Sequence, residues 1–188
     1  IKRAEAMQKL QTMALESAAN GIVITDVQGD IVWVNRAYTQ ITGYTFDEVK
    51  GKNPRILKSG RQSNEEYKKL WETILSGNVW QGEFVNKKKD GSLYIDEMSV
   101  TPVYGASGVI TNFIAIKQDV TDRKKTIQQL EEQAMLLDEA HEAIVVRDMN
   151  FIVQYWNKGA ERLFGWMATE AIGSDFRSLV YQNTSDNQ

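Results

Sequence analysis

The chain has 188 residues, a formal net charge of −3 and 42% hydrophobic residues, which is the composition of an ordinary soluble globular protein. It contains no cysteine, which excludes disulfides, thiolate chemistry and zinc–thiolate sites. The charge gives no reason to expect nucleic acid as a partner, and no apolar run is long enough to insert into a membrane. We therefore expect a cytoplasmic fragment of a longer protein, since Ile1 already belongs to a helical pattern.

Residues 1–19 are rich in good helix formers and contain neither Gly nor Pro, so they are expected to form a linker helix. Its imperfect apolar stripe fits either packing on its own domain or the end of a coiled coil. Residues 21–35 then carry two β-branched runs around a Gln-Gly-Asp turn, where Gly29 supplies the positive φ of a tight hairpin. Asn35 is expected to cap a short helix over 36–42, which Gly43 ends.

Two further helices are expected before the next strands. Thr45 and Glu48 have the spacing of a capping box, and Pro54 makes 51–55 a loop. A longer helix should begin at Asn64 as its N-cap and end at Gly77. Its apolar residues follow helical spacing and form one continuous face: Tyr67, Leu70, Trp71, Ile74 and Leu75.

From residue 79 the hydrophobic period changes to two, which predicts three long strands over 79–89, 92–104 and 109–119. Together with the opening hairpin they make a five-stranded antiparallel sheet, with the helices between strands two and three covering one face. The fold class is therefore α+β.

A polar helix is expected over 122–141, directly after the last strand. Four apolar residues recur in it at spacings of three, four and three and form an a/d seam: Ile127, Leu130, Ala134 and Leu137. Two heptads are fewer than a coiled coil normally needs, but a linker helix that pairs two chains is the economical interpretation. The chain's one histidine, His141, lies here and is expected to be a surface or interface residue.

The chain contains an internal repeat. Residues 14–55 align without a gap onto 136–177, so that Asn35 meets Asn157 and Gly43 meets Gly165. The second copy has nothing that matches 64–120, so it cannot close a sheet by itself. Its apolar side chains need a neighbour or stay partly exposed: Val145, Phe151, Tyr155, Trp156 and Phe164. We therefore expect a domain over 20–121 and the first half of a second domain over 142–188.

At this point the sequence resembles the PAS sensor-domain family. The motifs that carry the resemblance include Ile22-Val23-Ile24-Thr25-Asp26, Ile41-Thr42-Gly43-Tyr44, Gly51-Lys52-Asn53-Pro54-Arg55, Lys89-Asp90-Gly91-Ser92 and Asp119-Val120-Thr121-Asp122-Arg123. The resemblance implies a pocket for a small ligand, dimerisation through the flanking helices, and an output domain of kinase, cyclase or receptor type in the same chain. It also implies that Asp119, Thr121 and Asp122 form a signal relay in which Asp119 and Thr121 cap the exit helix.

Comparison with the flavin-binding branches of that family implies a cofactor site. Asn86, Asp96 and Lys117 stand where polar side chains of the light-sensing branch meet the flavin edge, although that branch has amides at the last two places. Pro54 stands where it has its reactive cysteine, so thiol-adduct photochemistry is excluded. The segment from Trp80 to Asn86 resembles a redox-sensing branch that binds FAD. The expected cofactor-binding residues are Arg55, Trp80, Phe84, Asn86, Asp96 and Lys117.

Several alternatives stay open at this point. Trp80 also fits ordinary core packing, Asp96 and Lys117 also fit a pair across the sheet, and the pocket also fits no ligand or another metabolite. No phosphate loop, nucleophile–base pair or metal cluster is evident, so catalysis within the chain is not expected. The leading function is sensing of redox state or a small ligand. The alternative is a ligand-free dimerisation scaffold that only transmits conformational change.

Overall fold

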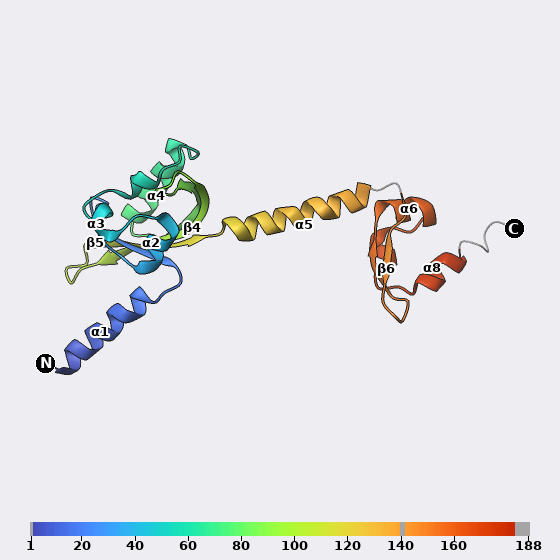
Figure 1. The fold of residues 1–188 in the computed structure, drawn as a ribbon, viewed down its shortest axis with the longest axis horizontal. Coiled ribbons are helices and arrows are strands. Elements are labelled where there is room, and N and C mark those ends of the chain that lie inside the picture. The colour runs from blue at the N-terminus through green and yellow to red at the C-terminus, as the bar shows by residue number, and fades with distance from the viewer. Residues whose placement is uncertain (1, 140–141, 183–188) are drawn as a thin grey trace. The chain divides into compact units, whose positions relative to one another are not determined.

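The structure is a computed structural model that describes residues 2–139 and 142–182 (Figure 1). It separates into two compact units, one up to Arg123 and one from Lys124 onward, which are called unit 1 and unit 2 and are described separately. The prediction for His141 lies outside the described residues.

Unit 1 begins with a helix, which is followed by two strands, a run of helices and three more strands. In chain order it contains α1 (Lys2–Glu16), β1 (Gly21–Asp26), β2 (Ile31–Val34), α2 (Arg36–Thr42), α3 (Phe46–Val49), the 3₁₀ helix η1 (Pro54–Leu57), α4 (Asn64–Leu75), β3 (Trp80–Lys87), β4 (Leu93–Tyr104) and β5 (Ile110–Asp119). Helix α5 (Thr121–Glu139) follows β5 directly and continues past the end of unit 1.

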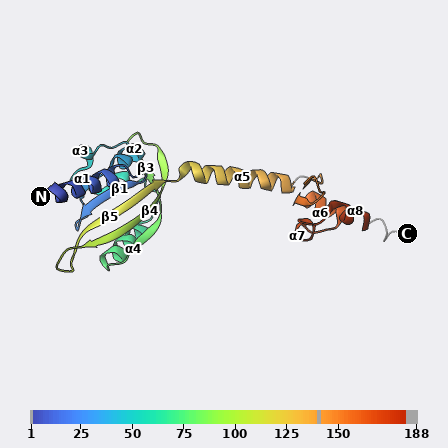
Figure 2. The same ribbon diagram turned by 90° about the horizontal axis from the view of Figure 1, so that it is seen from below.

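The five strands of unit 1 form one sheet in the order β2-β1-β5-β4-β3, and every neighbouring pair is antiparallel. Figure 2 shows β1, β5 and β4 side by side in this sheet. The apolar face carries two core clusters, one under α2, α3 and η1 and one under α4, and Ala115 of β5 packs against both. The predicted α+β fold with helices on one face is therefore confirmed.

Three local predictions need correction. Helix α4 is capped by Ser63 and not by Asn64, because the Ser63 hydroxyl and Glu66 complete a capping box. Pro54 begins η1 and not a loop, since the restriction of proline applies to Asn53, which is extended, and proline itself suits a first helical turn. Leu75 lies off the buried face of α4 and is 58% exposed.

Asn35 joins four segments of unit 1 through one side chain. Its Oδ1 accepts hydrogen bonds from the backbone N–H groups of Ile22 at 2.8 Å and Tyr38 at 3.0 Å. Its Nδ2 donates to the carbonyl oxygens of Leu15 and Asn20, both at 3.0 Å. The predicted helix cap is thus confirmed, and the same side chain also holds the end of α1.

Unit 2 repeats this arrangement on a smaller scale. It contains β6 (Val145–Arg147), β7 (Val153–Trp156), α6 (Lys158–Phe164), α7 (Ala168–Ala171) and α8 (Phe176–Gln182). Asn157 accepts from Ile144 and Ala160 and donates to the carbonyl oxygens of Leu137 and Glu142, at 2.8 to 3.0 Å. The hydrogen bonds of the two asparagines therefore match position by position across the repeat.

Helix α8 has no counterpart in the sequence-based prediction. Its residues Phe176 and Leu179 pack in the same cluster as Trp156, which is 3% exposed. Val145, Phe151, Tyr155 and Phe164 are partly exposed, as one of the two expected alternatives has it. The expectation is corrected only for Trp156, because α8 covers it from within the unit. The two strands of unit 2 still form only a two-stranded sheet.

Candidate functional site

A cavity of about 400 Å³ lies between the sheet and the helices of unit 1. Strands β1, β3, β4 and β5 supply one wall, and α2, η1 and α4 supply the other. Most of the lining side chains are aliphatic or aromatic, for example Val23, Leu57, Leu70, Trp71 and Phe113. This volume is within the range of cavities that bind small molecules and cofactors.

One end of the cavity is polar, because Asn86 of β3 and Lys117 of β5 both line it. Behind them lies Asp96 of β4, which is fully buried and accepts from Lys117 Nζ at 2.5 Å and from Asn86 Nδ2 at 2.8 Å, both through Oδ2. The pairing of Asp96 with Lys117 across the sheet, one of the open alternatives, is thus present. A buried ion pair of this kind contributes little net stability, because desolvation of the two charges offsets their attraction.

Two buried tyrosines complete the polar end. The Tyr94 hydroxyl donates to Asp96 Oδ2 at 3.3 Å, and burial together with this carboxylate raises the Tyr94 pKa far above its ordinary value. Burial likewise raises the pKa of Tyr38, whose hydroxyl has no hydrogen-bond partner among the described residues. Asp96 Oδ1 also lacks a partner among these residues. Unpaired buried polar atoms are costly, and a bound ligand or water would satisfy them.

Trp80 is not among the cavity-lining residues, which corrects its expected position at a ligand. It is 9% exposed and packs in the core cluster of Leu70 and Ile74. Phe84, which lies four positions further along β3 on the same face and two positions before Asn86, does line the cavity. Its ring centroid is 5.1 Å from that of Trp80 and 4.9 Å from that of Tyr67. Trp80 therefore supports Phe84, and Phe84 forms the wall.

The helical side of the cavity carries positive charge. It is lined by Arg55 of η1, by Lys58, which directly follows η1, and by Lys68 of α4. The Lys58 ammonium lies 3.6 Å from the centroid of the Tyr67 ring, a cation–π contact. Only Arg55 of these three was among the expected site residues. The two lysines were missed because the sequence does not show how close their segments lie to the sheet in space.

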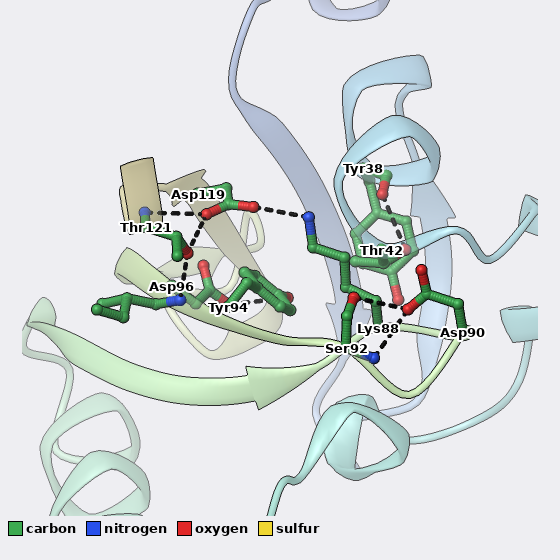
Figure 3. A network of polar contacts seen from close by, with 10 residues as sticks. Tyr38, Thr42, Lys88, Asp90, Ser92, Tyr94, Asp96, Asp119 and Thr121 are labelled. Carbon is green, nitrogen blue, oxygen red and sulfur yellow. Dashed lines mark hydrogen bonds and ion pairs between the residues drawn. The ribbon is translucent and has the colours of Figure 1, made fainter. Parts of the chain in front are cut away.

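A second polar network connects the sheet to α5 (Figure 3). Asp119 Oδ1, at the end of β5, accepts from the Thr121 backbone N–H at 3.0 Å and from its hydroxyl at 2.5 Å. The Thr121 hydroxyl in turn accepts from the Ile95 N–H of β4 at 2.8 Å. Asp119 thus anchors Thr121, which is the first residue of α5. The Thr121 hydroxyl links this residue to the neighbouring strand β4 and does not cap its own helix. Asp122 lies in the first turn of α5.

Lys88, which was not an expected site residue, is the cation of this network. It lies in the β3–β4 turn and donates to Asp119 Oδ2 at 2.8 Å, and its ammonium is 5.3 Å from the centroid of the Tyr94 ring. Partial burial opposes ionisation of Asp119. The hydrogen bonds from Lys88 and Thr121 outweigh that effect and hold the pKa of the Asp119 carboxyl below its ordinary range.

The predicted seam of α5 is exposed in the single chain. Ile127 is 48% exposed, Leu130 60% and Leu137 44%, and Ala134 is exposed as well. Dimerisation through this face stays a prediction.

Among the described residues no group of three or more histidine, cysteine and acidic side chains could hold a metal ion. No described helix has the length and apolar character that crossing a membrane requires.

Two family models identify the fold of this chain. A model described as "PAS domain" matches residues 19–122, and a model described as "PAS fold" matches residues 131–187. The chain belongs to the PAS domain family, and the predicted family membership is confirmed. Unit 1 is accordingly a sensory and signalling module.

Similar proteins include regulators and light receptors. The nitrogen fixation regulatory protein of Klebsiella oxytoca is 30% identical over 124 residues, which are 66% of this chain and 25% of that protein. The structure of an RNA-binding Light-Oxygen-Voltage receptor is 30% identical, has a TM-score of 0.62 and matches 71% of this chain and 38% of that one.

A structure entitled "Flavin Analogue Sheds Light on Light-Oxygen-Voltage Domain Mechanism" is also similar. It is 26% identical, has a TM-score of 0.55 and matches 68% of this chain and 98% of that one. The chain spans about a quarter of the length of the curated relative described above.

Proposed function

We propose that unit 1 binds a flavin in its cavity, specifically FAD, and senses redox state through it. The observation that carries the proposal is a cavity of about 400 Å³ with aromatic walls, one polar end and a cationic rim. The likeness to a Light-Oxygen-Voltage structure whose title names a flavin analogue supports the same ligand class. When bound, a flavin supplies reversible electron transfer, while the protein supplies binding, orientation and local charge.

The polar end has the hydrogen-bonding pattern that a heterocyclic amide edge needs. Lys117 uses its Nζ on Asp96 and on Met98 Sδ, at 3.4 Å, and retains a third N–H to donate to a ligand carbonyl. Asn86 commits its Nδ2 to Asp96, so its carbonyl oxygen is left to accept from a ligand N–H. A planar ring with adjacent carbonyl and N–H groups satisfies both side chains at once. The pyrimidine edge of a flavin is such a group.

The cationic rim fits the phosphates of a flavin nucleotide. Arg55, Lys58 and Lys68 line the helical side of the cavity, and guanidinium and ammonium groups are the usual partners of phosphate. The apolar and aromatic wall around Phe84 would hold the ring system between these two ends. Because Pro54 lines the cavity and the chain has no cysteine, the sensing step we propose is a change of flavin redox state and not a thiol adduct.

A cavity-filling variant tests this proposal. Ala115 lines the cavity, so Ala115→Leu places additional side-chain volume inside it, whereas Ala106→Leu makes the same change in the exposed β4–β5 turn. We expect the purified wild-type chain and the Ala106 variant to carry a visible absorption band that bleaches on reduction. The Ala115 variant should lose it.

Chromatography and mass spectrometry of the released ligand distinguish FAD from other flavins. A folded wild-type chain that neither retains nor takes up any flavin would refute the proposal and favour the dimerisation scaffold. A chain that releases a flavin other than FAD would retain the cavity assignment and overturn the specific cofactor.

The proposed output route runs from the sheet into α5. Asp119 and Thr121 attach α5 to β5 and β4, so a change at the sheet reaches the helix at its first residue. We propose that α5 pairs with a second copy through Ile127, Leu130, Ala134 and Leu137, and that it passes the change to an output domain elsewhere in the parent protein. The exposure of these apolar side chains supports the pairing.

A further inference from the structure

Four charged side chains alternate in sign between the cavity and the start of α5. Lys117 lines the cavity and pairs with Asp96, while Lys88 pairs with Asp119. Asp96 and Asp119 are direct partners in the β4–β5 register, so the two carboxylates are neighbours across the sheet. Between the two pairs lies Tyr94, whose hydroxyl bonds Asp96 and whose ring lies 5.3 Å from the Lys88 ammonium.

The two ion pairs differ in burial, and this difference lets the more exposed pair depend on the buried one. The side chains of Lys117 and Asp96 are 6% and 0% exposed, so bulk solvent does not reach Asp96 while the pair is intact. Lys88 and Asp119 are 29% and 25% exposed, and Lys88 is a long side chain in a turn. An uncompensated buried carboxylate is strongly unfavourable, and its second oxygen has no partner among the described residues. The nearby cation that can respond is therefore Lys88.

We propose that Lys88 is a shared cation whose position reports the charge at the polar end of the cavity. Negative charge on a ligand draws Lys117 away from Asp96. Lys88 then shifts past the Tyr94 ring towards Asp96 and weakens its bond to Asp119. Asp119 loses one of its partners, and the hydrogen bonds that attach Thr121 to the sheet loosen with it (Figure 3).

This inference rests on the proposed function only for the origin of the negative charge, which a reduced flavin would supply. The chemistry of the four side chains does not require the ligand. Substitution of Lys117 leaves Asp96 uncompensated in the same way. The relay can therefore be tested in the full chain without flavin, so that a failure of flavin binding and a failure of the relay give different results.

The test is hydrogen exchange at the junction between β5 and α5. The backbone N–H of Val120 donates to Ile95 O at 2.9 Å and that of Thr121 to Asp119 Oδ1 at 3.0 Å, so both amides report the attachment. We expect Lys117→Met to accelerate their exchange about two- to fivefold, the range that loss of one partly exposed ion pair produces. Lys88→Met should accelerate it equally, and the double variant should add nothing.

Two controls separate the relay from general loosening. Lys89→Met makes the same chemical change at the next residue, but Lys89 pairs with Glu48 and should leave the junction unchanged. Adding Asp96→Asn to Lys117→Met removes the carboxylate that attracts Lys88 and should restore the wild-type rate. Junction exchange that stays at the wild-type rate in Lys117→Met, or that the second substitution does not slow, would overturn the proposal.

Asp96→Asn alone keeps the relay testable if the Lys117 variant does not fold. It disturbs the most buried charge in the network, so general loosening predicts faster exchange at the junction. The relay predicts an unchanged rate, because Lys88 has no new acceptor and stays on Asp119. An acceleration as large as that in Lys88→Met would contradict the relay.

Discussion

Asn35 and Asn157 offer a matched perturbation, because the same side chain makes the same four hydrogen bonds in each unit. Replacement by alanine leaves two backbone donors of unit 1, those of Ile22 and Tyr38, without their acceptor. Each unsatisfied buried donor costs about 1–3 kcal/mol. We therefore expect Asn35→Ala to lower the free energy of unfolding of unit 1 by about 2–6 kcal/mol, and Asn157→Ala to lower that of unit 2 by a similar amount.

The consequences should differ because the cores differ. Unit 1 has two core clusters and should remain folded. Unit 2 has one cluster and a two-stranded sheet, so it should unfold. A loss of this size is a large part of the stability of a small domain, about 5–15 kcal/mol. Hydrogen exchange with mass spectrometry reports each unit separately within the full chain. Losses below about 1 kcal/mol at both asparagines would refute the reasoning, since they would mean that the orphaned donors find water.

Asn35→Asp separates the helix cap from the attachment of α1. The carboxylate still accepts from Ile22 and Tyr38, but it has no N–H to donate to the carbonyl oxygens of Leu15 and Asn20. We expect the amides of the last turn of α1 to exchange faster while those of α2 keep their protection. Equal acceleration in both helices would mean that the aspartate does not preserve the cap.

Two further predictions concern the exit from unit 1 and the helix beyond it. The folded-state pKa of Asp119 lies below its unfolded value of about 3.9, so its contribution to stability is present above that pH and is lost as the pH falls through the folded pKa. Lys88→Met should raise the Asp119 pKa, measured by NMR titration of the carboxyl; an unchanged pKa would show that Lys88 contributes nothing. In α5, Leu130→Ser with Leu137→Ser should convert a dimer to a monomer in sedimentation equilibrium, and a dimer insensitive to both changes would exclude this seam.

Features that depend on a few neighbouring residues were predictable from the sequence. The hairpin around Gly29, the cap at Asn35 and the end of α2 at Gly43 each follow from local backbone chemistry, and the structure has all three. The two-residue period of β3 puts Phe84 and Asn86 on one face, because successive side chains of a strand point to opposite sides, and the structure buries both. These requirements act within one element, so one sequence is enough to reveal them.

The composition of the site was only partly predictable. The sequence placed Asn86, Asp96 and Lys117 in one region through the family resemblance, and they do form one hydrogen-bonded group. It did not distinguish Trp80, which belongs to the core, from Phe84, which lines the cavity, because both lie on the same strand face. That distinction depends on how α4 packs over the strand.

By itself the sequence determined the alternation of side chains along the strands, the helix ends at Asn35 and Gly43, the repeat and therefore the family, since periodicity and backbone conformation are properties of short segments. Only the tertiary structure decided that Lys88 reaches Asp119, that Tyr94 lies between the two ion pairs, and that α8 covers Trp156. These contacts join residues distant in the chain, and their partners are set by the packing of whole elements. No local pattern in the sequence specifies that packing.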